Sequence, residues 1–109
     1  MLPKAEFNLE RSVNMKTKMG RFHIGEVVEH FKRDPKADKY TTKYLYRIIG
    51  FAEHTETCET MVVYQALYDD HEVYVRPYEM FASRVDKKKY PDSKAVFRFT
   101  KYNGDLSVL

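Results

Sequence analysis

Two short apolar segments separated by an acidic turn constrain the fold of this chain more than any other feature. Residues 61–68 read MVVYQALY and residues 72–76 read EVYVR, with three residues, Asp-Asp-His, between them. The valines of the second segment alternate with polar or amphipathic residues, which is the period of a strand, and so short a connection suits a hairpin. Pro77 fits the first position of a helix, where the amide hydrogen it lacks would have no partner. The stretch therefore predicts two antiparallel strands and then one helical turn over residues 77–81.

Three further segments have the character of strands, and together they suggest the fold class. Residues 44–52 are apolar on both faces, which favours a strand wrapped by a barrel over one lying on a solvated sheet. In the last segment Phe97 and Phe99 are expected to point inward, with Met80 and Phe81 filling one end of the core. Five strands with one helical turn before the last resemble a small SH3-like barrel, an all-β fold whose closure removes sheet edges. The three segments are residues 25–32, 44–52 and 95–101.

The size of the chain suits one domain with flanking segments. Folding hides only about 60 to 65% of the extended surface of a chain of 109 residues, so the core must be compact. We expect an N-terminal extension over residues 1–19, as a weak helix or a disordered arm, a barrel domain over residues 20–102 and a tail over residues 103–109. The single cysteine, Cys58, cannot form an internal disulfide, and no apolar run suits a signal peptide or a membrane span. A soluble cytoplasmic protein is expected.

The charges are distributed unevenly along the chain. Residues 53–80 hold seven acidic residues against Arg76 alone, whereas residues 84–102 hold seven basic residues against two acidic ones. The basic last strand could lie beside the acidic hairpin, each screening the other across neighbouring strands. It could instead form a surface for an anionic partner, because clustered Lys and Arg attract phosphate backbones. The predicted nucleic-acid-binding residues are Arg84, Lys94, Arg98 and Lys101.

Residues 54–59, HTETCE, gather imidazole, carboxylate and thiol, and are the first place to look for catalysis. The zinc deaminase motif needs two cysteine ligands, whereas Cys58 is the only cysteine, and the four scattered histidines do not complete a structural zinc site. Glutamates at 56 and 59 disfavour a thiolate at Cys58. The simpler interpretation is a tight strand connection in which Thr55 and Thr57 hydrogen-bond the local backbone. We expect no catalytic residue, no metal site and no cofactor.

A ligand-binding rim is the alternative for the same region. Arg76 lies at the end of a strand, where its guanidinium suits a two-pronged contact to a carboxylate or phosphate, or an internal ion pair with Glu56 or Glu72. Tyrosines at strand period can stack on bases or hold a proline-rich peptide, although such rings more often simply cover a sheet. The predicted ligand-binding residues are His54, Glu56, Tyr64, Arg76 and Tyr78.

These features favour a noncatalytic binding module whose partner is nucleic acid or a protein peptide. The rival hypothesis is a small enzyme acting on a nucleotide-like metabolite, with His54 as base, Glu56 orienting it and Arg76 on a phosphate. A pocket that joins these three side chains would favour the enzyme, and their separation would argue against it. A third hypothesis is an accessory domain that self-associates or docks on a larger enzyme. No membrane partner is expected, and the oligomeric state is left open.

Nine short blocks of the sequence carry a family resemblance. They are VEHFK (28–32), KYLYRII (43–49), HTET (54–57), VVYQALY (62–68), YVRP (74–77), MF (80–81), VD (85–86), KYP (89–91) and RF (98–99). In this order they closely resemble the bacterial family catalogued as domain of unknown function 1653. The resemblance implies a small all-β barrel in a bacterial protein with no established biochemical role. One departure is the turn at 68–71, which lacks the glycine that the family usually places after this tyrosine and so leaves the turn type open.

Overall fold

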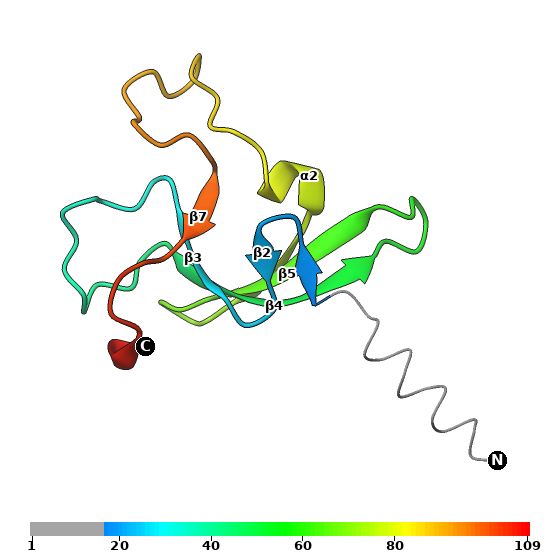
Figure 1. Cartoon of the computed structure of the whole chain (residues 1–109), viewed down its shortest axis with the longest axis horizontal. Helices are drawn as coiled ribbons and strands as arrows, with labels where there is room; N and C mark the ends of the chain where they lie inside the picture. Colours follow the sequence, from blue (N-terminus) through cyan, green and yellow to red (C-terminus); the bar gives the residue numbers. More distant parts are fainter. Residues whose placement is uncertain (1–16) are drawn as a thin grey trace.

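The protein is mostly β-structure, and a computed structural model describes its residues 17–109. Its elements are β1 (Lys18–Met19), β2 (Phe22–His23), β3 (Val27–His30), β4 (Leu45–Glu53), β5 (Thr60–Ala66), β6 (Val73–Pro77), α2 (Tyr78–Phe81), β7 (Phe99–Lys101) and the 3-10 turn η1 (Leu106–Val108). Strands β3 to β7 form one antiparallel sheet in the order β6-β5-β4-β3-β7, and β1 and β2 form a small hairpin (Figure 1). The predicted all-β class is confirmed, and a single helical turn follows β6 as expected.

The five-stranded sheet is open, so the predicted closed barrel is wrong for the described part of the chain. β6 and β7 are the two ends of the strand order and do not pair with each other. The last strand is also shorter than expected: the sequence predicts residues 95–101, whereas β7 begins at Phe99. Upstream of it, only an isolated bridge joins Arg84 to Phe97. The ammonium group of Lys87 donates to two carbonyl oxygens in this region, which holds the chain in a loop instead of a strand.

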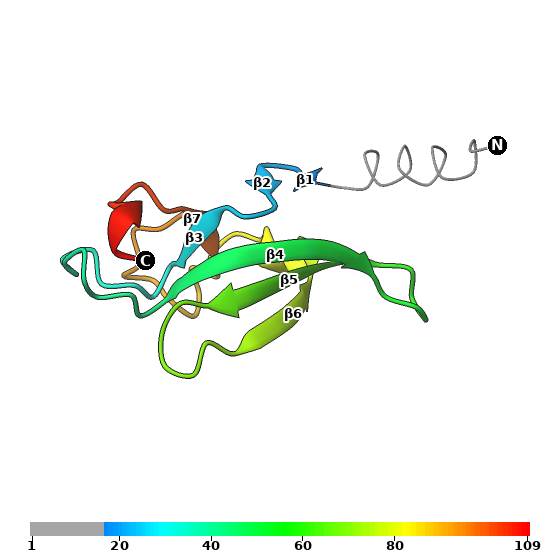
Figure 2. The same ribbon diagram turned by 90° about the horizontal axis from the view of Figure 1, so that it is seen from below.

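Aromatic rings fill the core on one face of the sheet. Phe81 of α2 stacks on Phe99 of β7, with ring centroids 4.1 Å apart and an angle of 8° between the planes. Phe22 of the β1–β2 hairpin meets Phe81 edge-on at 5.0 Å, so the hairpin covers the same face (Figure 2). All three rings are buried, as expected for Phe81 and Phe99, and each contributes roughly 2 to 3 kcal/mol of hydrophobic stabilisation. The cluster comprises Phe22, Val28, Tyr46, Ile48, Val62, Tyr64, Ala66, Phe81 and Phe99.

Two expectations about core residues are corrected. Met80 is 49% exposed, because in a single helical turn only one side can face the sheet, and Phe81 takes that side. Phe97 is half-buried, since it lies in the loop before β7, where the guanidinium of Arg21 covers its ring at 4.0 Å. The second face of β4 is covered at Leu45, which is fully buried, but not further along the strand. At the irregularity between Ile48 and Gly50, Ile49 is 44% exposed.

The structure describes the predicted terminal segments from residue 17 onward. Residues 1–16 of the expected extension, 1–19, lie outside the described residues. β1 occupies the last two residues of that extension, Lys18 and Met19. The expected tail contains η1, which Asp105 caps by accepting a hydrogen bond from the amide of Ser107. Among residues 17–109, no helix is long and apolar enough to cross a bilayer.

Candidate functional site

A large cleft opens on the β3–β7 side of the sheet and is the main candidate site. Its volume is about 1120 Å³, and two long loops form its walls. One loop, 31–44, follows β3, and the other, 86–98, precedes β7. The two loops extend from the same part of the sheet (Figure 1). Four half-buried aromatic rings contribute to the lining, namely Phe31, Tyr90, Phe97 and Tyr102.

Tyr90 joins the two walls of the cleft. Its ring meets that of Phe31 edge-on, with centroids 4.9 Å apart. The ammonium groups of Lys32 and Lys89 lie 5.4 and 5.6 Å from the centroid of the same ring. One lysine comes from each loop, so the cleft has an aromatic centre flanked by two cations. Such a cation over a ring is stabilised by the ring's negative face.

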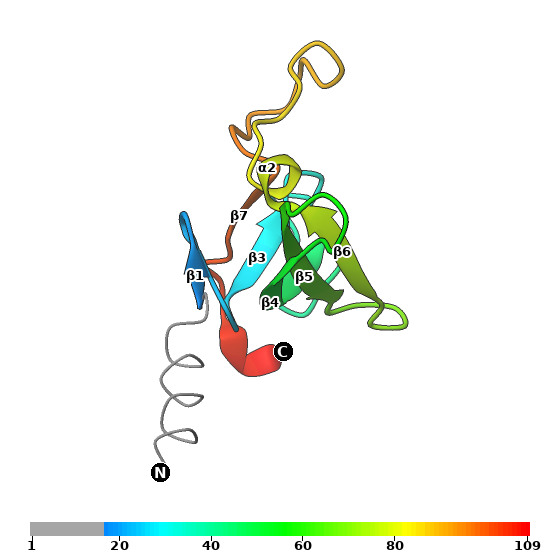
Figure 3. The same ribbon diagram turned by 90° about the vertical axis from the view of Figure 1, so that its right-hand side faces the viewer.

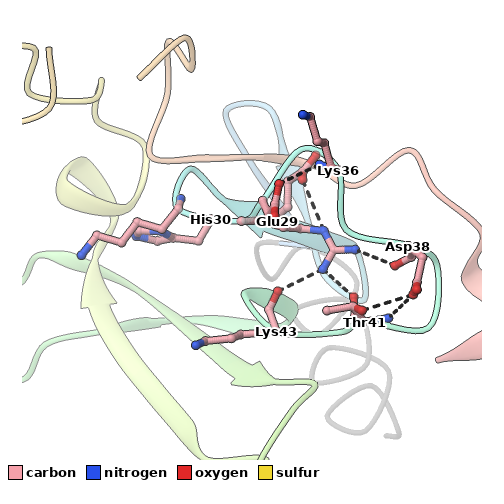
Figure 4. A network of polar contacts seen from close by, with 9 residues as sticks. Glu29, His30, Lys36, Asp38, Thr41 and Lys43 are labelled. Atoms are coloured by element: carbon pink, nitrogen blue, oxygen red, sulfur yellow. Dashed lines mark hydrogen bonds and ion pairs between the residues drawn. The ribbon is translucent and has the colours of Figure 1, made fainter. Parts of the chain in front are cut away.

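Arg33 organises the first loop from a buried position. Its guanidinium donates to the carbonyl oxygens of Thr41 at 2.6 Å and Lys43 at 3.0 Å. A third bond reaches the carbonyl oxygen of Asp38 at 3.4 Å, and the ion pair with Glu29 spans 3.8 Å (Figure 4). Only 9% of Arg33 is exposed, which a cation tolerates because these acceptors replace water. The planar fork of the guanidinium therefore fixes the shape of one wall.

Four carboxylates line the cleft, and two of them, Glu29 and Asp105, have a cationic partner, whereas Asp34 and Asp92 have none among residues 17–109. Burial raises the pKa of Glu29, and the charge of Arg33 acts in the opposite direction. Asp105 forms an ion pair with Lys39 at 3.5 Å. Within residues 17–109, by contrast, no ion pair involves three of the lysines that line the cleft. These lysines are Lys32, Lys89 and Lys94.

His30 lies at the end of β3, next to the cleft, and is neutral at physiological pH. Burial, followed by the charges of Arg98, Lys32 and Arg76, lowers its pKa to about 4. Its Nδ1 accepts a hydrogen bond from the amide of Lys32 at 3.1 Å, which requires an unprotonated nitrogen. The ring stacks on Tyr44 with centroids 5.7 Å apart. His30 therefore acts as an uncharged aromatic support for the first loop.

Tyr44 adopts an unusual backbone conformation where the first loop returns to the sheet. Its φ is +68°, in the left-handed region that non-glycine residues rarely occupy. The conformation directs its carbonyl oxygen to the amide of His30 at 2.9 Å and its ring onto that of His30. This conformation costs roughly 1 to 2 kcal/mol, and the two contacts with His30 offset the cost where the loop meets the sheet.

The predicted ligand-binding rim is divided by the structure. The Nε of Arg76 donates to the hydroxyl of Tyr64 at 3.2 Å, so these two residues do come together. His54 and Glu56 lie in the turn that joins β4 to β5, which extends beyond the rest of the sheet (Figure 2). There the Nδ1 of His54 accepts from the amides of Glu56 and Thr57, as a turn cap does. The structure therefore does not join His54 and Glu56 with Arg76.

The predicted rim contains two tyrosines, of which Tyr64 is buried and Tyr78 is half-buried. Tyr64 is only 4% exposed, and its ring packs between neighbours on the core face. The hydroxyls of Tyr46 and Tyr68 lie 2.5 Å apart, and burial together with this hydrogen bond raises the pKa of Tyr46. Tyr78 lies against the β1–β2 turn, where its hydroxyl occupies the space that a side chain at Gly20 would need.

Of the four predicted nucleic-acid-binding residues, only Lys94 lines the cleft. Arg84 is exposed, with its guanidinium 5.4 Å from the centroid of Phe97. The Nε of Arg98 donates to the hydroxyl of Ser83 at 3.2 Å, and Lys101 is exposed on β7. The four side chains do not gather in one site.

Sequence analysis did not identify the residues that shape the cleft. Arg33 lies in a polar stretch, residues 33–42, that has no strand or helix period, and Phe31 and Tyr90 fall in no predicted site. One weak signal was available: Arg33 follows Glu29 by four residues and immediately precedes an Asp-Pro turn. Among residues 17–109, no group of three or more His, Cys, Asp or Glu side chains could hold a metal ion.

Together these features define a small open antiparallel sheet whose loops enclose an aromatic, lysine-flanked cleft. The chain belongs to the family described as "Protein of unknown function (DUF1653)", whose model matches residues 26–101. That range includes the whole five-stranded sheet and most of the cleft. No curated protein and no solved structure matches the chain.

Proposed function

We propose that the protein is a noncatalytic module that binds single-stranded nucleic acid in the loop cleft. The observation that carries the proposal is the pairing of Tyr90 with Lys32 and Lys89, one cation from each wall. Bases stack on aromatic rings for about 1 to 3 kcal/mol each, whatever their sequence. Lysine ammonium groups contact the phosphates that link successive bases. A cleft of about 1120 Å³ has room for more than one nucleotide.

The charge balance of the cleft supports nucleic acid over a peptide. Glu29 and Asp105 have cationic partners, so two carboxylates of the lining, Asp34 and Asp92, stand without an ion pair among residues 17–109 against three such lysines, Lys32, Lys89 and Lys94. The bacterial origin and cytoplasmic location suggested by the sequence are part of this proposal. So is a kinship with SH3-like barrels, which the number of strands and the helical turn support. The enzymatic alternative has less support, because His54 caps its own turn while Arg76 binds Tyr64.

Fluorescence anisotropy with a labelled single-stranded RNA of mixed sequence tests the proposal. If three lysines contact phosphates, affinity should fall about 20-fold between about 50 and 200 mM salt. Tyr90→Ala should weaken binding about tenfold by removing the stacking surface. Lys89→Ala should weaken binding and reduce its salt dependence. The matched control is Lys18→Ala, which removes one exposed lysine from β1, outside the cleft.

Two results would count against nucleic acid. Binding that does not respond to salt would exclude phosphate contacts by these lysines. Equal effects of Lys89→Ala and Lys18→Ala would place the binding surface outside the cleft. Failure to bind RNA, combined with salt-insensitive binding of a proline-rich peptide that Tyr90→Ala abolishes, would assign the cleft to a protein partner instead.

A further inference from the structure

β6 is an edge strand without the usual protection against pairing with another strand. It ends the strand order of the sheet and lies at its margin in two perpendicular views (Figures 2 and 3). Val73 and Val75 are 54% and 59% exposed, and Tyr74 between them is 44% exposed. Edge strands are commonly blunted by lysine, proline or a bulge. In β6 the register with β5 is continuous, and proline occurs only at its end, at Pro77.

The backbone groups of this edge are oriented for a further strand. The amide of Ala66 donates to the carbonyl oxygen of Glu72, which fixes the hydrogen-bonding alternation between β5 and β6. In an antiparallel pair every second residue bonds to the neighbour and the others point away. Tyr74 therefore bonds to β5, while the N–H and C=O groups of Val73 and Val75 point away from the sheet. They offer two donors and two acceptors to another chain.

The sequence of this edge is complementary to itself. Residues 72–76 read Glu-Val-Tyr-Val-Arg. When two such strands run antiparallel with Tyr74 opposite Tyr74, Val73 lies opposite the partner's Val75. These are the residues whose backbone groups point outward, so four hydrogen bonds form between the strands. Glu72 then lies opposite the partner's Arg76, once at each end of the pairing.

The charged side chains at the two ends of this segment, Glu72 and Arg76, are free to pair with a second copy. Within residues 17–109, no ion pair involves Glu72 or Arg76. Arg76 uses its Nε to bind Tyr64, which holds the side chain in place and leaves both Nη groups for a carboxylate. Glu72 is exposed. A generic peptide strand would satisfy the backbone groups, but a second copy also supplies the opposite charge at each end.

We propose that the protein forms a two-fold symmetric dimer in which two β6 strands pair antiparallel about Tyr74. The two sheets then become one continuous sheet, and the exposed valines of both copies lie side by side on its outer face. The dimer goes beyond the proposed binding of nucleic acid. Because β6 and β7 are opposite ends of the strand order, the two clefts lie toward opposite ends of the joined sheet. Both remain open.

Charge-reversal variants test the register of the dimer. Glu72→Arg places cations at both ends of the edge, and Arg76→Glu places anions at both ends. Each variant alone should dimerise about tenfold more weakly than the wild type, because like charges lie opposite each other across the pair. An equimolar mixture should dimerise as the wild type does, since each cation again faces an anion. Sedimentation equilibrium over a concentration series measures all four samples.

A proline variant tests the backbone pairing separately. Val75→Pro removes one outward amide hydrogen, which edge strands tolerate because that group faces solvent in the monomer. We expect a folded monomer, with its fold checked by circular dichroism. Val75→Thr keeps the amide and nearly the same shape, and should remain dimeric. A wild-type protein that stays monomeric up to millimolar concentration would overturn the proposal. So would a dimer that both charge variants and Val75→Pro leave unchanged.

Discussion

At the scale of single residues, His30 couples the stability of the fold to pH. Its pKa is lowered to about 4 by burial and by the cations around it, against about 6.5 in an unfolded chain. Below pH 6.5 the unfolded chain takes up a proton that folded His30 does not accept. Stability should therefore be unaffected by this group above pH 6.5 and should fall as the pH drops from about 6.5 to 4. For a half-buried group we expect a loss of about 1 to 2 kcal/mol.

Urea unfolding of the wild type and His30→Asn at several pH values measures this effect. Asparagine cannot titrate, and its side-chain oxygen can still accept from the amide of Lys32. The variant should lose the dependence on pH between about 6.5 and 5, whatever its overall stability. Identical slopes in the two proteins would mean that other groups cause the dependence.

Arg33 should be needed for the shape of the cleft wall as well as for stability. Arg33→Lys keeps the charge but loses the fork that reaches the carbonyl oxygens of Thr41, Lys43 and Asp38. We expect the free energy of unfolding to fall by about 1 to 3 kcal/mol. Trypsin should also cleave the 31–44 loop faster. Arg84→Lys, the same change at an exposed arginine, is the control and should alter neither property.

Single residues of the site were harder to predict than those of the core. Phe81 and Phe99 were placed correctly as apolar residues of predicted elements, although the same reasoning placed Met80 and Phe97 too far inward. Arg33 could not be placed, since its partners are backbone carbonyl oxygens whose positions depend on a loop without period. The contact of Arg76 with Tyr64 was partly predictable. The two residues are on neighbouring strands, but only the register, Val62 opposite Arg76, brings them together.

At the scale of elements, the β5–β6 turn is a site of local strain. Asp69 and His71 have φ values of +50° and +55°. Asp69 follows Tyr68, where the sequence lacks the glycine expected from the family resemblance. Asp69→Gly should therefore stabilise the protein by about 0.5 kcal/mol, as relief of the left-handed conformation exceeds the added flexibility of the unfolded chain. Thermal unfolding measures the change.

The neighbouring residue provides a matched control for this turn. Asp70 is equally exposed, and its φ is not positive. Asp70→Gly should destabilise the protein by about 0.5 to 1 kcal/mol, because glycine there adds only flexibility to the unfolded chain. If both glycine variants destabilise the protein, the left-handed conformation of Asp69 is not a significant source of strain.

The strands were predictable from the sequence because each is an apolar or alternating segment, but the length of the last strand was not. β4, β5 and β6 lie close to the expected ranges. The last strand is shorter, since Lys87 binds carbonyl oxygens of the preceding segment that a ladder would otherwise use. Such a long-range contact leaves no periodic signal.

At the scale of the whole molecule, packed side chains link the two ends of the sheet that backbone hydrogen bonds do not join. β6 leads directly into α2, and Phe81 of α2 stacks on Phe99 of β7. The two ends of the strand order are therefore linked through an aromatic contact instead of a ladder of hydrogen bonds. Phe22 packs against the same pair from the β1–β2 hairpin. This arrangement gives a chain of 109 residues one shared core without a closed barrel.

Phe81→Ala should therefore affect the molecule as a whole. Removing this buried ring should lower the free energy of unfolding by about 3 to 5 kcal/mol, a large part of the 5 to 15 kcal/mol typical of domains. Urea unfolding measures the loss. Hydrogen exchange should increase in β7 more than in β4, because β4 keeps neighbours on both sides, whereas β7 pairs only with β3 and loses the stacked ring. Phe97→Ala, at a half-buried ring, is the control and should cost less. A uniform increase in exchange would show that Phe81 stabilises the sheet generally and does not tie β7 to α2.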